Sequence, residues 1–162
     1  MGLATALLII GAASTANATI INLNARDSNN MVSLLLEAGT YNIEVIGKDE
    51  GGAYNAWDAW GDGTYWINSY TFSSTAFGIQ SIYDGVKYTR DLDALANAID
   101  SSFTLSSTAN VDFYISDDPY FDNQGGMSLN VTGAPVPEPA TMFLFGIGMV
   151  GLAGCRIRKK NG

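Results

Sequence analysis

The sequence of 162 residues contains no histidine and a single cysteine, Cys155. Without histidine there can be no serine–histidine–aspartate triad, no histidine-ligated zinc or iron site, and no side chain that normally titrates near neutral pH. One cysteine cannot form an intramolecular disulfide or supply a cysteine-rich metal cluster. These absences remove several large classes of enzyme and metal site before any motif is considered.

Basic residues are also scarce, with 8 Lys and Arg against 16 Asp and Glu, for a formal net charge of −8. No charged side chain occurs in residues 1–18, and four of the eight basic residues lie in residues 156–160. Residues 19–136 hold 15 acidic and 4 basic side chains, a net charge of −11. We therefore expect no nucleic-acid partner. A segment with this negative charge is well suited to bind a hard cation, although an excess of carboxylates more often serves only to keep a protein soluble.

The first 18 residues predict a cleaved secretory signal. Residues 2–13 are apolar, and Ala16-Asn17-Ala18 supplies the small-x-small pattern that signal peptidase accepts before Thr19. The segment has no Lys or Arg at its start, so only the α-amino group is positively charged there. A buried core helix is the alternative interpretation. The signal predicts an exported chain.

The C-terminal end has three elements in a fixed order. Pro137-Glu138-Pro139 comes first, a glycine-rich apolar stretch covers residues 140–155, and a basic cluster follows, made of Arg156, Arg158, Lys159 and Lys160. As a helix, residues 140–155 would be about 24 Å long at roughly 1.5 Å per residue, and snorkelling arginines would let it span a ~30 Å hydrocarbon core. The basic cluster stays cytoplasmic by the positive-inside rule. The pattern predicts one transmembrane helix.

This end of the chain, residues 135–162, resembles the PEP-CTERM sorting signal of Gram-negative bacteria. The resemblance implies a membrane peptidase, exosortase, as a partner and a precursor anchored in the inner membrane. It also implies a mature domain that is periplasmic, on the outer surface or extracellular. Pro137 and Pro139 favour extended backbone, which keeps the junction accessible to a protease.

Residues 19–134 predict an all-β domain. Short β-branched or aromatic runs, several of them alternating, indicate strands at residues 19–25, 32–36, 41–46, 65–72, 77–83, 103–105, 111–116 and 127–132. Only residues 92–99 have helical spacing, with Leu92, Leu95, Ala96 and Ile99 on one face. About eight strands, one short helix and loops rich in Gly, Asp and Asn favour an antiparallel jelly-roll β-sandwich.

The densest polar segment is residues 116–126, between two predicted strands. The carboxylates of Asp117, Asp118 and Asp122 and the amide of Asn123 lie within seven residues, next to glycines. Such a loop can curl around Ca²⁺, which takes six to eight oxygens at ~2.3–2.6 Å. A solvated acidic turn is an equal alternative.

A second loop, residues 48–63, combines aromatic and acidic side chains. Carbohydrates stack an apolar ring face on an aromatic side chain and form hydrogen bonds through their hydroxyls, so Trp57 and Trp60 are candidate sugar-binding residues. The alternative is that both tryptophans fill one end of the core. The stretch starting at Asp58 is not an EF-hand, because Trp60 and Ser69 stand where oxygen ligands are needed.

Taken in order, the two loops are similar to those of the calcium-dependent galactophilic lectins, which have a galactose-binding jelly-roll fold. The resemblance implies Ca²⁺ held by Asp117 or Asp118, Asp122 and Asn123, with the carbonyl of Tyr54 opposite, and a sugar bound through the metal. The sugar-contacting histidine of that family has no counterpart in this chain. The resemblance therefore implies a calcium site but does not imply recognition of galactose.

Catalysis is the remaining class of function. Asp49, Glu50, Asp58 and Asp62 could supply a glycosidase carboxylate pair, but a domain of about 115 residues leaves little room for a substrate cleft. We expect no enzyme. The sequence favours an exported surface or matrix protein that binds calcium and a carbohydrate, and the alternative is a structural exopolysaccharide- or biofilm-associated protein with no specific ligand.

Overall fold

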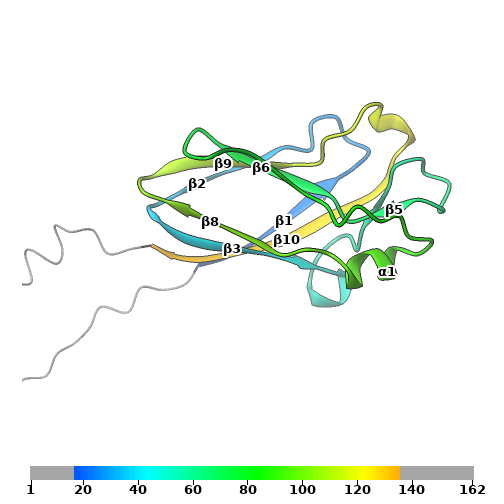
Figure 1. Cartoon of the computed structure of the whole chain (residues 1–162), viewed down its shortest axis with the longest axis horizontal. Helices are drawn as coiled ribbons and strands as arrows, with labels where there is room; N and C mark the ends of the chain where they lie inside the picture. The colour runs from blue at the N-terminus through cyan, green and yellow to red at the C-terminus, as the bar shows by residue number, and fades with distance from the viewer. Residues whose placement is uncertain (1–16, 136–162) are drawn as a thin grey trace, which may run out of the picture. The chain divides into compact units, whose positions relative to one another are not determined.

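The computed structural model describes residues 17–135 (Figure 1). The predicted transmembrane helix and the first 16 residues of the predicted signal lie outside this range. Within it, no helix combines the length and the apolar character needed to cross a bilayer. The description below concerns this domain alone.

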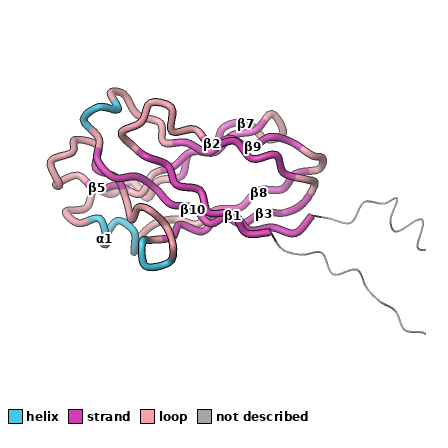
Figure 2. Tube along the Cα trace, turned by 180° about the vertical axis from the view of Figure 1, so that it is seen from behind, coloured by secondary structure: helices cyan, strands magenta, loops and turns pink. Residues whose placement is uncertain are grey.

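Two antiparallel sheets make up the domain, and Figure 2 shows them as two layers. The first sheet contains six strands, namely β1 (Asn17–Asn24), β3 (Gly39–Ile46), β4 (Trp57–Asp58), β5 (Trp66–Ile67), β8 (Ser101–Leu105) and β10 (Gln124–Pro135). The second contains four, namely β2 (Val32–Leu36), β6 (Tyr70–Ser74), β7 (Gly78–Ile82) and β9 (Ala109–Tyr114).

The eight longer strands follow the order of a double-sheet jelly roll. They run β1-β10-β3-β8 in the first sheet and β2-β9-β6-β7 in the second. The chain therefore changes sheet at almost every connection, which covers the inner face of each layer with the other. The predicted all-β sandwich with one short helix is confirmed.

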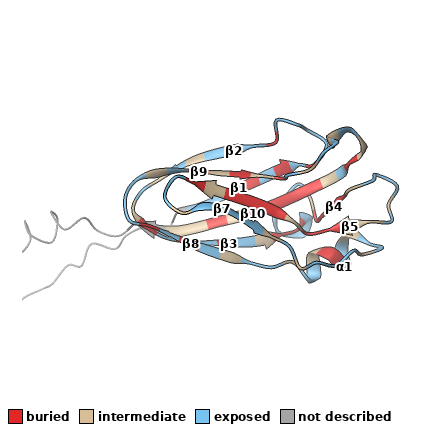
Figure 3. Cartoon of the chain, turned by 45° about the horizontal axis from the view of Figure 1, so that its top comes forward, coloured by how far each residue is buried: buried red, intermediate tan, exposed pale blue. Residues whose placement is uncertain are grey.

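Aromatic side chains fill the space between the layers. The Phe72 ring lies 5.6 Å from that of Phe103 and 6.3 Å from that of Phe113, centroid to centroid. Figure 3 shows buried residues along β1 and β10, where Ile21, Leu23 and their neighbours are almost fully buried. Burying each such side chain stabilises the fold by roughly 1.5–3 kcal/mol, which explains why a core forms without a disulfide.

Two predicted elements differ in detail. The strand expected at residues 65–72 is split into β5 and β6 at Asn68, whose buried Nδ2 donates to Asp84 Oδ2 (2.9 Å) and to the Ala94 carbonyl (3.0 Å). The helix, α1 (Asp91–Ala96), ends earlier than expected. Its predicted buried face is wrong, because Ala94 is buried whereas Leu92 and Ile99 are 48% and 43% exposed. Distant hydrogen bonds, not helical periodicity, fix both segments.

The described chain begins and ends on one side of the sandwich. β1 and β10 pair antiparallel from Asn17↔Gly133 to Asn24↔Gly126. The residues after β1 and before β10 therefore meet at the opposite side, here called the loop end (Figure 1). β1 starts two residues before the predicted cleavage point at Thr19, so cleavage there would shorten the strand by Asn17 and Ala18.

Candidate binding site at the loop end

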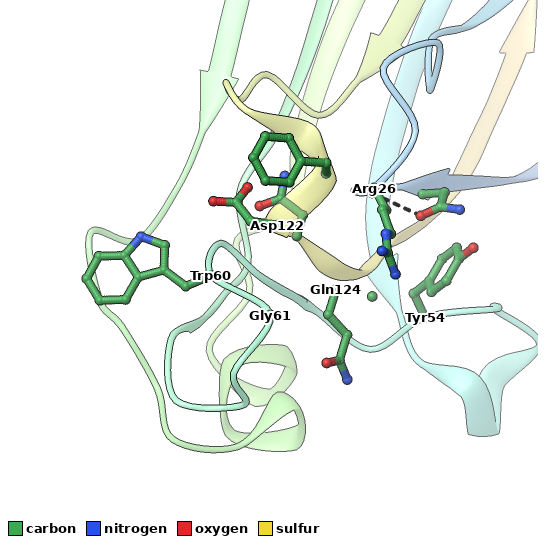
Figure 4. A pocket seen from close by; sticks show the side chains of 10 residues that line it. Arg26, Tyr54, Trp60, Gly61, Asp122 and Gln124 are labelled. Atoms are coloured by element: carbon green, nitrogen blue, oxygen red, sulfur yellow. Dashed lines mark hydrogen bonds between the residues drawn. The ribbon is translucent and has the colours of Figure 1, made fainter.

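A pocket of about 510 Å³ lies at the loop end (Figure 4). Its wall comes from the end of β1 and the loop that follows it, the loop before β4, the turn after β4, the 3-10 helix η2 (Tyr120–Asp122) and the start of β10. The lining residues are Asn24, Arg26, Tyr54, Trp60, Gly61, Phe121, Asp122, Asn123, Gln124 and Gly125. Both loops singled out in the sequence thus contribute to one pocket.

The carboxylate of Asp58 shapes the turn that carries Trp60. Asp58 is completely buried, and its Oδ1 accepts hydrogen bonds from the backbone N–H groups of Trp60 (2.9 Å) and Gly61 (3.1 Å). Its Oδ2 accepts a third from Gly63. Hydrogen bonds to a charged acceptor are roughly twice as strong as neutral ones. Asp58 is therefore a structural residue that positions one wall of the pocket.

The two loops touch at Gly61. This residue has a φ of +65°, and a Cβ atom built there would lie only 2.5 Å from the carbonyl oxygen of Asp122. Only glycine combines the left-handed backbone with such a close approach. Gly61 consequently fixes the spacing between the Trp60 turn and η2.

Adjacent side chains in the pocket wall carry buried oxygens that lack a partner. Asn123 is 3% exposed, and its Nδ2 donates to the Ala25 carbonyl at 3.0 Å. Within residues 17–135, Asn123 Oδ1 and Asp122 Oδ1 are buried and accept no hydrogen bond. An unsatisfied buried polar group costs about 1–3 kcal/mol, so these positions favour a donor or a cation from outside the chain.

Two of the residues that line the pocket, Trp60 and Phe121, have exposed aromatic rings. Trp60 is 55% exposed, and Figure 4 shows its ring pointing away from Arg26 and Tyr54. The ring lies 4.0 Å from that of Tyr65, and Lys87 Nζ stands 5.3 Å from its centroid. Phe121 is 74% exposed. A cation over an aromatic face is attractive, so Lys87 helps to hold the Trp60 ring in place.

Trp57 occupies a different environment from Trp60. It is 2% exposed, belongs to the core cluster, and donates its Nε1–H to the Ser69 carbonyl at 2.9 Å. Trp57 therefore fills the core, the alternative considered for it, and offers no ring face to a sugar. Of the two tryptophans, Trp60 is the one whose ring is exposed.

The structure brings together part of the predicted calcium site. Tyr54, Asp122 and Asn123 line the same pocket, whereas Asp117 and Asp118 do not. In the described part of the chain, no group of three or more His, Cys, Asp or Glu side chains could hold a metal ion. The expected cluster of three carboxylates is thus not formed. Calcium binding stays a prediction that rests on Asp122 and Asn123.

Sequence reasoning missed Arg26, Asn24 and Gln124, which line the pocket. Asn24 and Gln124 have no distinguishing sequence signal, because isolated amides occur in many loops. Arg26 did have one, as one of 4 basic side chains between residues 19 and 136. It forms no ion pair within residues 17–135, where the ion pair present joins Arg90 to Asp93. Its guanidinium is available to a ligand.

A separate polar network holds the segment before α1. Burial alone would raise the pKa of Asp84, but hydrogen bonds from Tyr88, Val86 and Asn68 outweigh it and lower that pKa. Tyr88 donates its hydroxyl to Asp84 Oδ2 at 2.6 Å, and this bond raises the pKa of Tyr88 to about 12. The network supports the loop end without lining the pocket.

Comparison with known families concerns the C-terminal end. Residues 135–159 match the PEP-CTERM protein-sorting motif. The chain carries a PEP-CTERM sorting signal. This confirms the prediction made from Pro137-Glu138-Pro139 and the basic cluster, and it implies an exported protein, anchored at the membrane until exosortase processes it. No curated protein and no solved structure matches the chain.

Proposed function

We propose that this exported PEP-CTERM protein acts at the cell surface or in the extracellular matrix by binding a carbohydrate in the loop-end pocket, with Ca²⁺ held by Asp122 and Asn123. The observation that carries the proposal is that Asp122 and Asn123, whose Oδ1 atoms are buried and accept no hydrogen bond within residues 17–135, line the same pocket as two side chains with exposed aromatic rings. Saccharide sites combine such rings with a few directed polar groups.

The oxygens present suit a hard cation, because Ca²⁺ binds carboxylate and amide oxygens. Asp122 and Asn123 supply one unpartnered oxygen each, which is fewer than the six to eight that Ca²⁺ takes. Backbone carbonyls, water and sugar hydroxyls would complete the shell. Calcium would thus contribute charge and a bridge to sugar hydroxyls.

The remaining residues of the pocket have separate roles in this proposal. Trp60 and Phe121 offer exposed ring faces for stacking, while Asn24 and Gln124 present amides for hydroxyl groups. Figure 4 shows Arg26 next to Tyr54, on the side of the pocket away from Trp60. A cation at Asp122 and the guanidinium of Arg26 would therefore occupy different parts of the pocket, and Arg26 adds a donor for a sugar oxygen.

Thermal unfolding of the processed protein, with chelator and then with millimolar Ca²⁺, tests the metal. Ligand at 100 times its dissociation constant stabilises by about 2.7 kcal/mol, which raises Tm by roughly 4–8 °C for a domain near this size. We expect the shift to vanish in Asp122→Ala and to persist in Asp117→Ala, which removes a carboxylate outside the pocket. If Ca²⁺ does not change the Tm of the native protein, the proposed calcium site is wrong, and the alternative of a structural protein without a specific ligand is favoured.

Calorimetric titration with purified surface polysaccharide tests the sugar. We expect binding to fall at least tenfold in Trp60→Ala and to recover largely in Trp60→Phe, because phenylalanine keeps a stacking face. Chelator should weaken binding to the native protein. Equal affinity in the native protein and Trp60→Ala would contradict the role of the pocket.

A further inference from the structure

The loop-end pocket contains two side chains of opposite charge that do not pair. Arg26 and Asp122 are the charged residues of its lining, yet the ion pair in the described part of the chain joins Arg90 to Asp93. The cation–π contacts in that part are made by Lys87. Within the described domain, the guanidinium of Arg26 therefore has neither an ionic nor an aromatic partner, although a carboxylate lines the same pocket.

The backbone of Arg26 is fixed next to the proposed cation site. The residue before it, Ala25, donates its N–H to the Gly125 carbonyl at 3.1 Å and accepts a hydrogen bond from Asn123 Nδ2 at 3.0 Å. Arg26 donates its own backbone N–H to Asn24 Oδ1 at 3.0 Å. The side chain of Arg26 thus starts from a segment that is anchored to Asn123, whose Oδ1 has no partner in the described domain.

The acidic side chain adjacent in the sequence, Asp27, has a different role. Its Oδ1 accepts a hydrogen bond from the Asn29 N–H at 2.8 Å, so it stabilises the turn that follows β1. Figure 4 shows the Arg26 side chain next to Tyr54 and apart from Asp122. A ligand that contacts both charged groups must therefore extend across the pocket.

A guanidinium that a ligand encloses needs an anionic partner. Burying an unpaired charge is costly, so a neutral sugar placed over Arg26 would remove water from the guanidinium without neutralising it. The planar fork of the guanidinium matches a carboxylate, with which it forms two parallel hydrogen bonds. Uronic acids carry such a carboxylate on the sugar ring, together with hydroxyl groups.

The charge of the pocket differs from that of the domain around it. Residues 19–136 are strongly acidic, but the pocket lining holds one charge of each sign. A bound Ca²⁺ would make the pocket positive. An anionic sugar would then be attracted to the pocket and repelled by the rest of the domain.

We propose that the sugar bound at the loop end is a uronic acid. Its carboxylate pairs with Arg26, while its hydroxyls reach the calcium ion at Asp122 and Asn123. Arg26 is then the residue that selects an acidic sugar over a neutral sugar with the same ring. This inference rests on the proposed function and adds the class of sugar to it.

Paired oligosaccharides test the need for a carboxylate. Short oligosaccharides from purified surface polysaccharide are compared with the same preparation after chemical reduction of its carboxylates to primary alcohols. In calorimetric titrations of the processed protein with millimolar Ca²⁺, we expect the acidic form to bind about tenfold more tightly than the reduced form, or better. Equal affinities for the two forms would overturn the inference.

Variants of Arg26 test which group recognises the carboxylate. We expect Arg26→Gln to bind the acidic form about tenfold more weakly and the reduced form within about twofold of the native affinity, so that the preference disappears. Arg26→Lys keeps the charge without the fork and should recover only part of the preference. Lys48→Gln, which removes an exposed positive charge outside the pocket, should leave both affinities unchanged.

The proposed function and this inference fail in different ways. If neither form binds the native protein, or if Trp60→Ala binds both forms as tightly as the native protein does, the proposed function is wrong and the inference fails with it. If binding depends on Trp60 but a folded Arg26→Gln, verified by its Tm, keeps the preference for the acidic form, the inference alone is overturned.

Discussion

The two ends of the sandwich are built differently. At the end where the described chain begins and finishes, neighbouring strands are joined by connections of two or three residues, at residues 37–38, 75–77 and 106–108. At the loop end one connection, residues 68–69, has two residues, and the other five are seven to eighteen residues long, at residues 25–31, 47–56, 59–65, 83–100 and 115–123. The comparison teaches that short turns between paired strands close one end with few side-chain hydrogen bonds, such as those of Ser74, whereas the long loops of the other end depend on buried polar side chains such as Asp58 and Asn68 for their shape.

Among the changes that test this difference between the two ends, removing the Asp58 carboxylate should reduce the free energy of unfolding most. Asp58→Ala leaves three backbone N–H groups without their acceptor, so we expect a loss of about 3 kcal/mol in the free energy of unfolding. Denaturant titration measures it. Asp62→Ala removes an exposed carboxylate from the same turn, and Thr40→Ala removes an exposed hydroxyl at the other end. Each should reduce the free energy of unfolding by much less than Asp58→Ala does. Equal losses would mean that the turn does not depend on Asp58.

A substitution at Gly61 should have an intermediate effect. Gly61→Ala adds a methyl group against the Asp122 carbonyl and also strains the backbone, whereas Gly63→Ala, with φ of +83° and open space, strains the backbone alone. We expect Gly63→Ala to lower the free energy of unfolding by about 1 kcal/mol, and Gly61→Ala to lower it by about 1–2 kcal/mol more, as measured by denaturant titration. Gly61→Ala should also weaken any calcium-dependent rise in Tm. Similar values for the two variants would indicate that the loops are not in tight contact.

Acidification should have the smallest effect. The pKa of Asp84 is lower in the folded protein than in the unfolded chain, so its contribution is present above the unfolded value near 3.9 and is lost as pH falls through the folded value. Tm scans between pH 7 and pH 3 should show Asp84→Asn less stable than the native protein at pH 7, by less than about 1 kcal/mol, and the difference should shrink towards pH 3. If the difference in stability between the native protein and Asp84→Asn grew on acidification, the lowered pKa of Asp84 in the folded protein would be contradicted.

Much of the fold was predictable because the alternation of apolar and polar residues indicates which face of a strand is buried. In β3, Tyr41 and Ile43 are buried and Asn42 and Glu44 are exposed, as the sequence indicates. β4 was missed because two residues are too few to show alternation. The interruption at Asn68 was missed because its partners, Asp84 and Ala94, are 16 and 26 residues away.

The candidate site was predictable only in part, because its loops are shaped by contacts between segments. Trp57 and Trp60 have similar local sequences, yet Trp57 is in the core and Trp60 in solvent, because the buried Asp58 carboxylate reverses the chain between them. Tyr54, Asp122 and Asn123 line one pocket, whereas Asp117 and Asp118 of the same acidic loop do not. Charge density in a sequence does not determine which carboxylates share a pocket.

β10 also has a mechanical consequence. Its first residues, Gln124 and Gly125, line the pocket, and its last, Pro135, begins the sorting motif, so one strand of 12 residues and roughly 40 Å connects the two. A pull between the pocket and the C-terminal side would load this strand lengthwise against β1 and β3, which flank it. The hydrogen bonds of both ladders would then resist together in shear, so the load would pass through the middle of the sheet without bending the loops.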